Sequence, residues 1–129
     1  MDRCGAVGVA DMSRLRRGMV IDVNLDPTRG AETGKIRPCV IVTNNTYNAR
    51  VPVIQVVPLT AWSARKTRII THVEIVPSSR NGLSKQSVAD CLQTRPIDHR
   101  ARLVTVRGEL EDEVMAKMDD ALKIVFALM

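Results

Sequence analysis

Residues 19–25 read M-V-I-D-V-N-L, and this stretch decides the fold because apolar side chains at odd positions alternate with Asp22 and Asn24. A period of two is typical of a strand with one buried face and one face in water. Residues 37–43, R-P-C-V-I-V-T, contain a continuous apolar run, which indicates a strand buried on both faces. Pro38 has no backbone N–H, so it must occupy a position where the sheet needs no donor.

Turn-forming residues separate four further segments that have the composition of short strands. These segments are residues 51–59, 67–76, 87–97 and 103–107. Residues 26–35 hold two glycines and a proline, which predicts an exposed loop between the first two strands. Residues 44–50 are polar and turn-prone. Residues 61–66 have no apolar periodicity and predict a mobile basic loop.

From Glu111 onward the apolar residues follow the 3.6-residue period of a helix. Its apolar side holds Val114, Met118, Ala121, Leu122, Val125 and Leu128, widened by Met115, Ile124 and Met129. So broad an apolar arc predicts a mostly buried helix that either packs deeply on the sheet or meets a second copy of the chain. Six short strands and one helix predict a mostly β fold, a small antiparallel barrel with a C-terminal α-helix.

The composition describes one globular domain with a real core. The chain has 129 residues, of which 45% are hydrophobic and only 2% aromatic. Few aromatic rings argue against an RNA-binding surface that stacks successive bases. We expect residues 1–14 to be a flexible tail, with Met12 as an alternative start, and residues 15–129 to be the domain. The net charge of +5 favours a polyanionic partner without identifying it.

The three cysteines, Cys4, Cys39 and Cys91, form no C-x-x-C pair and no disulfide framework. Cys39 and Cys91 lie in apolar runs, where a free thiol behaves as a small hydrophobic side chain. No cysteine stands at metal-ligand spacing from either histidine, so we expect no structural metal and no cofactor. Free thiols and the lack of an apolar stretch long enough to span a bilayer predict a cytoplasmic protein.

Polar residues collect where the predicted strands begin and end. Arg37 stands immediately before a buried strand, and its guanidinium fork suits a phosphate, which makes it our leading phosphate ligand. The alternative is a surface arginine paired with a carboxylate. Thr60 stands where the third predicted strand ends, and Glu32 and Lys35 belong to the first loop.

Several fragments in register resemble one family. They are Arg17-Gly18, Leu25-Asp26-Pro27-Thr28-x-Gly30-x-Glu32, Arg37-Pro38-x-Val40-x-Val42, Asn48, Val57-Pro58-Leu59-Thr60, Ser87-Val88 and Gln93-x-Arg95-x-Ile97-Asp98. In order and spacing they resemble the MazF/PemK toxins of type II toxin-antitoxin systems, from about Arg16 to the C terminus.

This resemblance implies an SH3-like barrel that acts as a homodimer, cleaves single-stranded mRNA at short sequences without a metal, and is inhibited by a MazE-like antitoxin. It assigns the catalytic arginine to Arg37 and the catalytic threonine to Thr60. Glu32 matches a glutamate in the flexible loop beside the active site. The expected products are a 2′,3′-cyclic phosphate and a 5′-hydroxyl.

RNA carries its own nucleophile, the 2′-hydroxyl, so the protein must only stabilise phosphoryl charge and move protons. The identity of the proton acceptor stays open, and the candidates are Glu32, His72 and Arg37 itself. Glu32 is equally well interpreted as a salt-bridge partner. The sequence departs from several relatives at Leu92, where they carry an acid, and at Asp90, where some carry an arginine. Asp90 either replaces the missing carboxylate or is a plain surface residue.

The choice of RNA sequence is expected to come from side chains beside Arg37 and Thr60, which we call the phosphate clamp. The RNA-binding candidates are Asn24, Lys35, Asn44, Thr46, Trp62, Arg65 and Lys66. Two other classes stay open: a non-catalytic toxin like the CcdB gyrase poisons, and a binding module whose active site has decayed.

Overall fold

The computed structural model describes residues 14–129, so the expected tail lies outside the described residues except for Arg14, as does Cys4. Within this range seven strands form one antiparallel sheet in the order β4-β5-β3-β2-β1-β7, and β6 pairs with β3 off this path. The strands are β1 Met19–Asn24, β2 Ile36–Ile41, β3 Val53–Ala61, β4 His72–Ile75, β5 Ser87–Asp90, β6 Arg95–Asp98 and β7 Leu103–Glu109.

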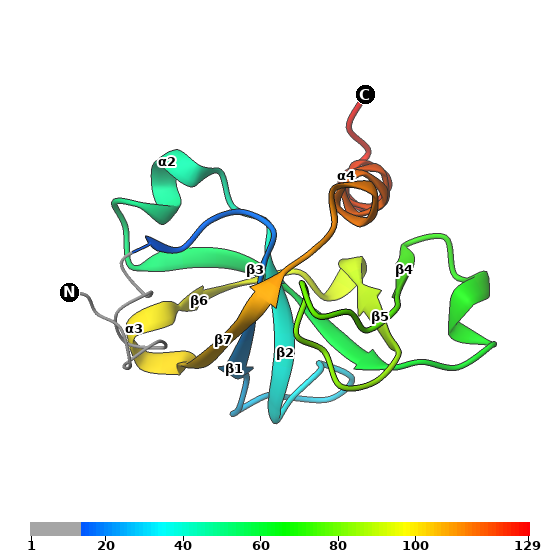
Figure 1. Cartoon of the computed structure of the whole chain (residues 1–129), viewed down its shortest axis with the longest axis horizontal. Helices are drawn as coiled ribbons and strands as arrows, with labels where there is room; N and C mark the ends of the chain where they lie inside the picture. Colours follow the sequence, from blue (N-terminus) through cyan, green and yellow to red (C-terminus); the bar gives the residue numbers. More distant parts are fainter. Residues whose placement is uncertain (1–13) are drawn as a thin grey trace.

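The long strand β3 organises the sheet, because β6 pairs with its first half and β5 with its last three residues. The two end strands, β4 and β7, do not pair with each other, so the sheet is open. The expected mostly antiparallel β fold with a C-terminal helix is confirmed. Figure 1 shows the α4 helix beside the sheet, between the β3 and β4 regions.

The described helical segments are α2 Asn45–Asn48, η2 Lys66–Arg68, η3 Cys91–Gln93, α3 His99–Arg102 and α4 Asp112–Phe126. The side chain of Asn44 accepts from the amide of Thr46 and starts α2. Acidic residues in the first turn of α4 complement its dipole, and Ala127, with φ of 56°, ends it. None of the helices in residues 14–129 is long and apolar enough to cross a membrane.

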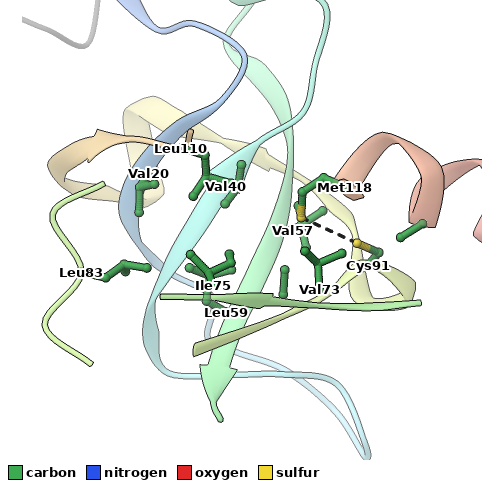
Figure 2. Packing of buried hydrophobic residues seen from close by; sticks show 12 residues of the cluster. Val20, Val40, Val57, Leu59, Val73, Ile75, Leu83, Cys91, Leu110 and Met118 are labelled. Carbon is green, nitrogen blue, oxygen red and sulfur yellow. Dashed lines mark hydrogen bonds between the residues drawn. The ribbon is translucent and has the colours of Figure 1, made fainter. Parts of the chain in front are cut away.

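Two apolar clusters form the core, one on each side of β1 and β2. Val20 and Val40 belong to the first cluster, which Met118 of α4 covers, whereas Ile21 and Cys39 belong to the second. In the first cluster the sulfur atoms of Cys91 and Met118 lie 4.0 Å apart (Figure 2). Burial raises the pKa of Cys39 and of Cys91 to about 12, so both thiols stay protonated and act as core residues.

Two predicted strands are wrong in extent. Residues 87–97 are not one strand, because η3 separates β5 from β6 and turns Cys91 into the core while Leu92 stays exposed. In residues 67–76 the strand begins only at His72, because residues 66–68 form a helical turn. Pairing with the neighbouring strand decides where each one begins, and the apolar composition alone does not show it.

The helix begins one residue after the predicted Glu111, but it is not mostly buried. Only Met118 and Ala121 are fully buried, and Val114, Met115, Leu122 and Val125 are partly buried against the core. Near its end Ile124 and Phe126 are exposed by 48% and 55%.

Candidate active site

Arg37 and Thr60 line the same pocket, although 23 positions separate them in the sequence. Strands β2 and β3 pair with Cys39 opposite Pro58, and two more residues in this register place Arg37 opposite Thr60. The pocket has a volume of about 330 Å³, and its polar lining comes from Arg37, Thr60, Ser84, Lys85, Ser87 and Arg107. The sheet therefore brings together the two residues that the sequence analysis ranked highest.

The guanidinium of Arg37 is held on one side and open on the other. Its Nε donates to the carbonyl of Gly34 at 2.9 Å. Within residues 14–129 no protein acceptor holds its two terminal nitrogens, and no carboxylate lies within ion-pair distance. The expected alternative, an arginine neutralised by a carboxylate, therefore does not describe this part of the chain. Both terminal nitrogens are free to bind two oxygens of one phosphate.

The hydroxyl of Thr60 has a cationic neighbour. Lys66 Nζ donates to Thr60 Oγ1 at 3.3 Å and to the carbonyl of Ala61 at 2.7 Å. Because Oγ1 accepts from the ammonium group, its own proton is free to point toward a bound oxygen. The predicted basic loop thus contributes Lys66 directly to the site.

Lys85 and Arg107 also reach this pocket, and the sequence analysis missed both. Ala61 pairs with Ser87, so the start of β5 lies beside the end of β3, and Lys85 stands two residues before Ser87. Arg107 Nε pairs with Asp22 Oδ1 at 2.7 Å, and its Nη1 donates to the carbonyl of Gly82. That pairing neutralises Arg107, whereas no acidic partner is recorded for Lys85 among the described residues. An antiparallel pairing of the predicted strands 51–59 and 87–97 would have indicated that Lys85 lies near the end of the first of them.

Glu32 lies in the loop between β1 and β2, and it does not line the pocket. Its carboxylate accepts from the amide of Arg29 at 2.8 Å, and its own amide donates to the carbonyl of Arg29. The carboxylate closes a turn and forms no ion pair among the described residues, and its role as a proton acceptor stays a prediction. The loop itself leads through Gly34 to Arg37.

His72 belongs to a different site. Its Nε2 lies 3.3 Å from Asp90 Oδ1, and it lines a separate pocket between β4 and α4 with Lys117. Asp90 therefore lies within ion-pair distance of a histidine on the neighbouring strand, and its role in place of the acid missing at Leu92 stays a prediction. Neither His72 nor Asp90 lines the pocket of Arg37 and Thr60.

The predicted RNA-binding residues divide between two ends of the molecule. Trp62, Arg65 and Lys66 follow β3 directly, and Asn24 and Lys35 stand at the base of the loop that leads to Arg37. Asn44 and Thr46 lie at α2, beside the start of β3, about 20 Å from Thr60 at the usual rise per strand residue (Figure 1). Within one chain those two residues are not beside the phosphate clamp.

No group of three or more His, Cys, Asp and Glu side chains that could hold a metal ion is found among the described residues. The site thus consists of cations, hydroxyls and backbone groups.

Comparison with known proteins identifies the family. Residues 16–126 match the family model described as the PemK-like, MazF-like toxin of type II toxin-antitoxin systems. This chain belongs to that family. Endoribonuclease EndoA of Bacillus subtilis (strain 168) is 38% identical over 114 residues, which cover 88% of this chain and 96% of EndoA.

Solved structures of the family have the same fold. MazF of Deinococcus radiodurans is similar with a TM-score of 0.75 and 22% identity, covering 88% of this chain and 97% of that chain. An endoribonuclease in complex with its cognate antitoxin, from a mycobacterial species, is similar with a TM-score of 0.71 and 23% identity, covering 89% and 97%. At this identity the likeness shows the fold alone.

Proposed function

We propose that this chain is the toxin of a type II toxin-antitoxin system and cleaves single-stranded mRNA at a short sequence. The observation that carries the proposal is the shared pocket of Arg37 and Thr60, in which the arginine keeps two terminal nitrogens free. Membership of the toxin family and 38% identity to an endoribonuclease support it. The gyrase-inhibiting alternative has no such support.

In the proposed reaction the 2′-oxygen bonds to phosphorus and the bond from phosphorus to the 5′-oxygen breaks. The 2′-hydroxyl proton goes to a base, and the departing 5′-oxygen takes up a proton. The products are a 2′,3′-cyclic phosphate and a 5′-hydroxyl. Arg37 binds the non-bridging oxygens and stabilises the charge that grows on them. Thr60 donates its hydroxyl proton to a neighbouring oxygen and aligns the phosphate, while Lys66 polarises that hydroxyl.

Glu32 is our candidate for the proton acceptor. Its loop leads into β2 and Arg37, and among residues 14–129 the amide of Arg29 is the one group that holds the carboxylate. Release of that contact and a movement of the loop would bring it to the reacting atoms. The pH profile of Glu32→Gln tests this role, since loss of the base removes the acidic limb of the rate profile.

The surfaces of the chain support the proposed partners. Lys35 directly precedes β2, and Trp62 and Arg65 follow β3, so we propose these three residues as RNA contacts. The exposed apolar end of α4, at Ile124 and Phe126, supports a homodimer. The complex of MazE with MazF in Deinococcus radiodurans supports a MazE-like antitoxin as partner, and the net charge of +5 suits an acidic one. We place the toxin in the cytoplasm, where mRNA is found.

The proposal is tested by incubating the protein with a long single-stranded RNA in EDTA and mapping the new 5′ ends. We expect cuts at one short word that are lost in Arg37→Ala and kept in Arg80→Ala, because Arg80 lies outside the pocket of Arg37 and pairs with Asp112 at the surface. Intact RNA together with inhibited gyrase would favour the CcdB-like alternative. Intact RNA that is still bound would indicate a decayed site.

A further inference from the structure

The side chain of Gln93 holds the tip, residues 28–33, of the loop between β1 and β2. Gln93, the last residue of η3, accepts from the amide of Thr33 at its Oε1 and donates from its Nε2 to the carbonyl of Ala31, both at 3.3 Å. The side-chain amide suits both contacts, because its oxygen accepts and its nitrogen donates. The two backbone groups stand on either side of Glu32.

The base of the loop is fixed independently of Gln93. Arg95 Nη1 donates to the carbonyl of Leu25 at 3.1 Å, and Arg102 Nη1 donates to the carbonyls of Asn24 and Asp26 at 2.9 and 2.6 Å. Within residues 14–129, Gln93 is the only side chain from outside the loop that bonds residues 28–33. Its removal therefore frees the tip and leaves the base in place.

The tip is coupled to Arg37 through the next residue. Gly34 follows Thr33 directly, and its carbonyl holds Arg37 Nε. Gly34 is tightly enclosed, since a Cβ there would lie 2.6 Å from Asp26 Oδ1 and Thr28 Oγ1. A displacement of Thr33 acts on this carbonyl through Gly34, although the amide of Lys35, which belongs to the same peptide group, is held by Asp26 Oδ1 at 2.9 Å.

We propose that Gln93 is a positioning residue: its amide clasps the loop tip and, through Gly34, orients Arg37 for the phosphate. This inference rests on the proposed function. A clasp that orients the clamp acts on the transition state more than on the binding of a long RNA. Its loss should therefore lower kcat and leave KM nearly unchanged.

The test compares the wild type with Gln93→Ala, Gln93→Glu and the control Gln86→Ala. Gln86 is an exposed glutamine whose side chain bonds Glu74 outside the loop. Gln93→Glu keeps the length and the acceptor for Thr33 but loses the donor to Ala31. Circular dichroism and melting first establish that each variant is folded.

Backbone ¹⁵N relaxation measures the clasp without any RNA. We expect the order parameter of the Thr33 amide to be about 0.85 in the wild type and in Gln86→Ala, and to fall below about 0.6 in Gln93→Ala. The amide of Leu25, which bonds the carbonyl of Lys35, should stay rigid in every variant. An equally rigid Thr33 in Gln93→Ala would overturn the clasp.

Cleavage of a short RNA then tests the coupling. We expect kcat to fall about tenfold in Gln93→Ala, the loss typical of one or two hydrogen bonds, and less in Gln93→Glu. A mobile tip with an unchanged kcat, or a raised KM alone, would overturn the positioning role. A wild type that cuts no RNA would contradict the proposed function instead, and the relaxation result would still decide whether the clasp exists.

Discussion

Lys66 Nζ lies 3.3 Å from Thr60 Oγ1 and joins the helical turn after β3 to the hydroxyl that faces Arg37 across the pocket. The ammonium group occupies an acceptor position of the hydroxyl oxygen, which leaves the hydroxyl proton for a ligand. In the proposed reaction the loop after β3 therefore prepares the hydroxyl of Thr60 through Lys66.

The Thr60→Val variant tests that hydroxyl directly. Valine has nearly the same shape but offers no oxygen to Lys66 and no proton to a phosphate. We expect the single-turnover cleavage rate to fall about tenfold, because one charge-assisted hydrogen bond is lost. An unchanged rate in a folded variant would remove the Thr60 side chain from the mechanism.

The Arg37→Lys variant separates charge from geometry. Lysine keeps the positive charge but loses the fork and the Nε contact with Gly34. We expect kcat to fall about a hundredfold, as for the loss of one donor that stabilises transition-state charge, with little change in KM. Arg80→Lys is the matched control, and equal losses in the two variants would contradict a special role for Arg37.

Lys85 is expected to contact the RNA backbone, because it lines the pocket and has no acidic partner among the described residues. Lys85→Ala should weaken RNA binding and reduce the slope of log K against log salt by about 0.7, the value for one phosphate contact on a single strand. Fluorescence anisotropy across a salt series measures this slope. Lys117→Ala, in the separate pocket between β4 and α4, should leave this slope unchanged.

Arg37 and Thr60 were expected at strand ends, and the structure brings them to one pocket, while their role as a phosphate clamp stays a proposal. The alternation in 19–25 and the apolar run in 39–42 located β1 and β2, and the register between β2 and β3 then brought Arg37 to Thr60. Local patterns were enough for this step, since adjacent antiparallel strands are the commonest neighbours in a chain.

Contacts that depend on pairing between strands far apart in the sequence could not be predicted from local patterns. Lys85 enters the site only because β5 returns beside β3, and Asp90 has a partner only because β4 places His72 opposite it. The turn at Glu32 depends on one amide contact with Arg29, and nothing in the composition of the loop signals it. These features require the register between strands far apart in the sequence.

Asn81 is a buried asparagine that organises the turn after β4. Its side chain accepts from the amides of Ser78 and Leu83 and donates to the carbonyl of Val76. Asn81→Ala leaves these buried groups unpaired, and we expect the free energy of unfolding to fall by about 2–3 kcal/mol. Urea denaturation measures the loss. Ser79→Ala, at an exposed position of the same turn, should change it little.

Glu111 links this turn to the start of α4 and makes the free energy of unfolding depend on pH in the acidic range. The hydroxyl of Ser78 donates to its Oε2 at 2.5 Å and holds the pKa of Glu111 below its ordinary value of 4.5. A lowered carboxylate pKa adds stability that is present above pH 4.5 and is lost as the pH falls through the lower, folded-state pKa.

Thermal melts between pH 7 and pH 3 test this linkage. The wild type should lose melting temperature below about pH 4.5, and Ser78→Ala should show a smaller loss over the same interval. Equal acid dependence in both proteins would show that the contact between Ser78 and Glu111 has no effect on stability.

The central claim is that Arg37 and Thr60 hold a phosphodiester while the 2′-hydroxyl of the RNA attacks it. Its most direct test is cleavage of an RNA that carries a single 2′-deoxy nucleotide immediately 5′ of the mapped cut. We expect this RNA to bind as tightly as the unmodified strand and to stay intact, while cleavage of the unmodified strand leaves a cyclic phosphate. Cleavage of the deoxy-substituted strand at the same bond would contradict it.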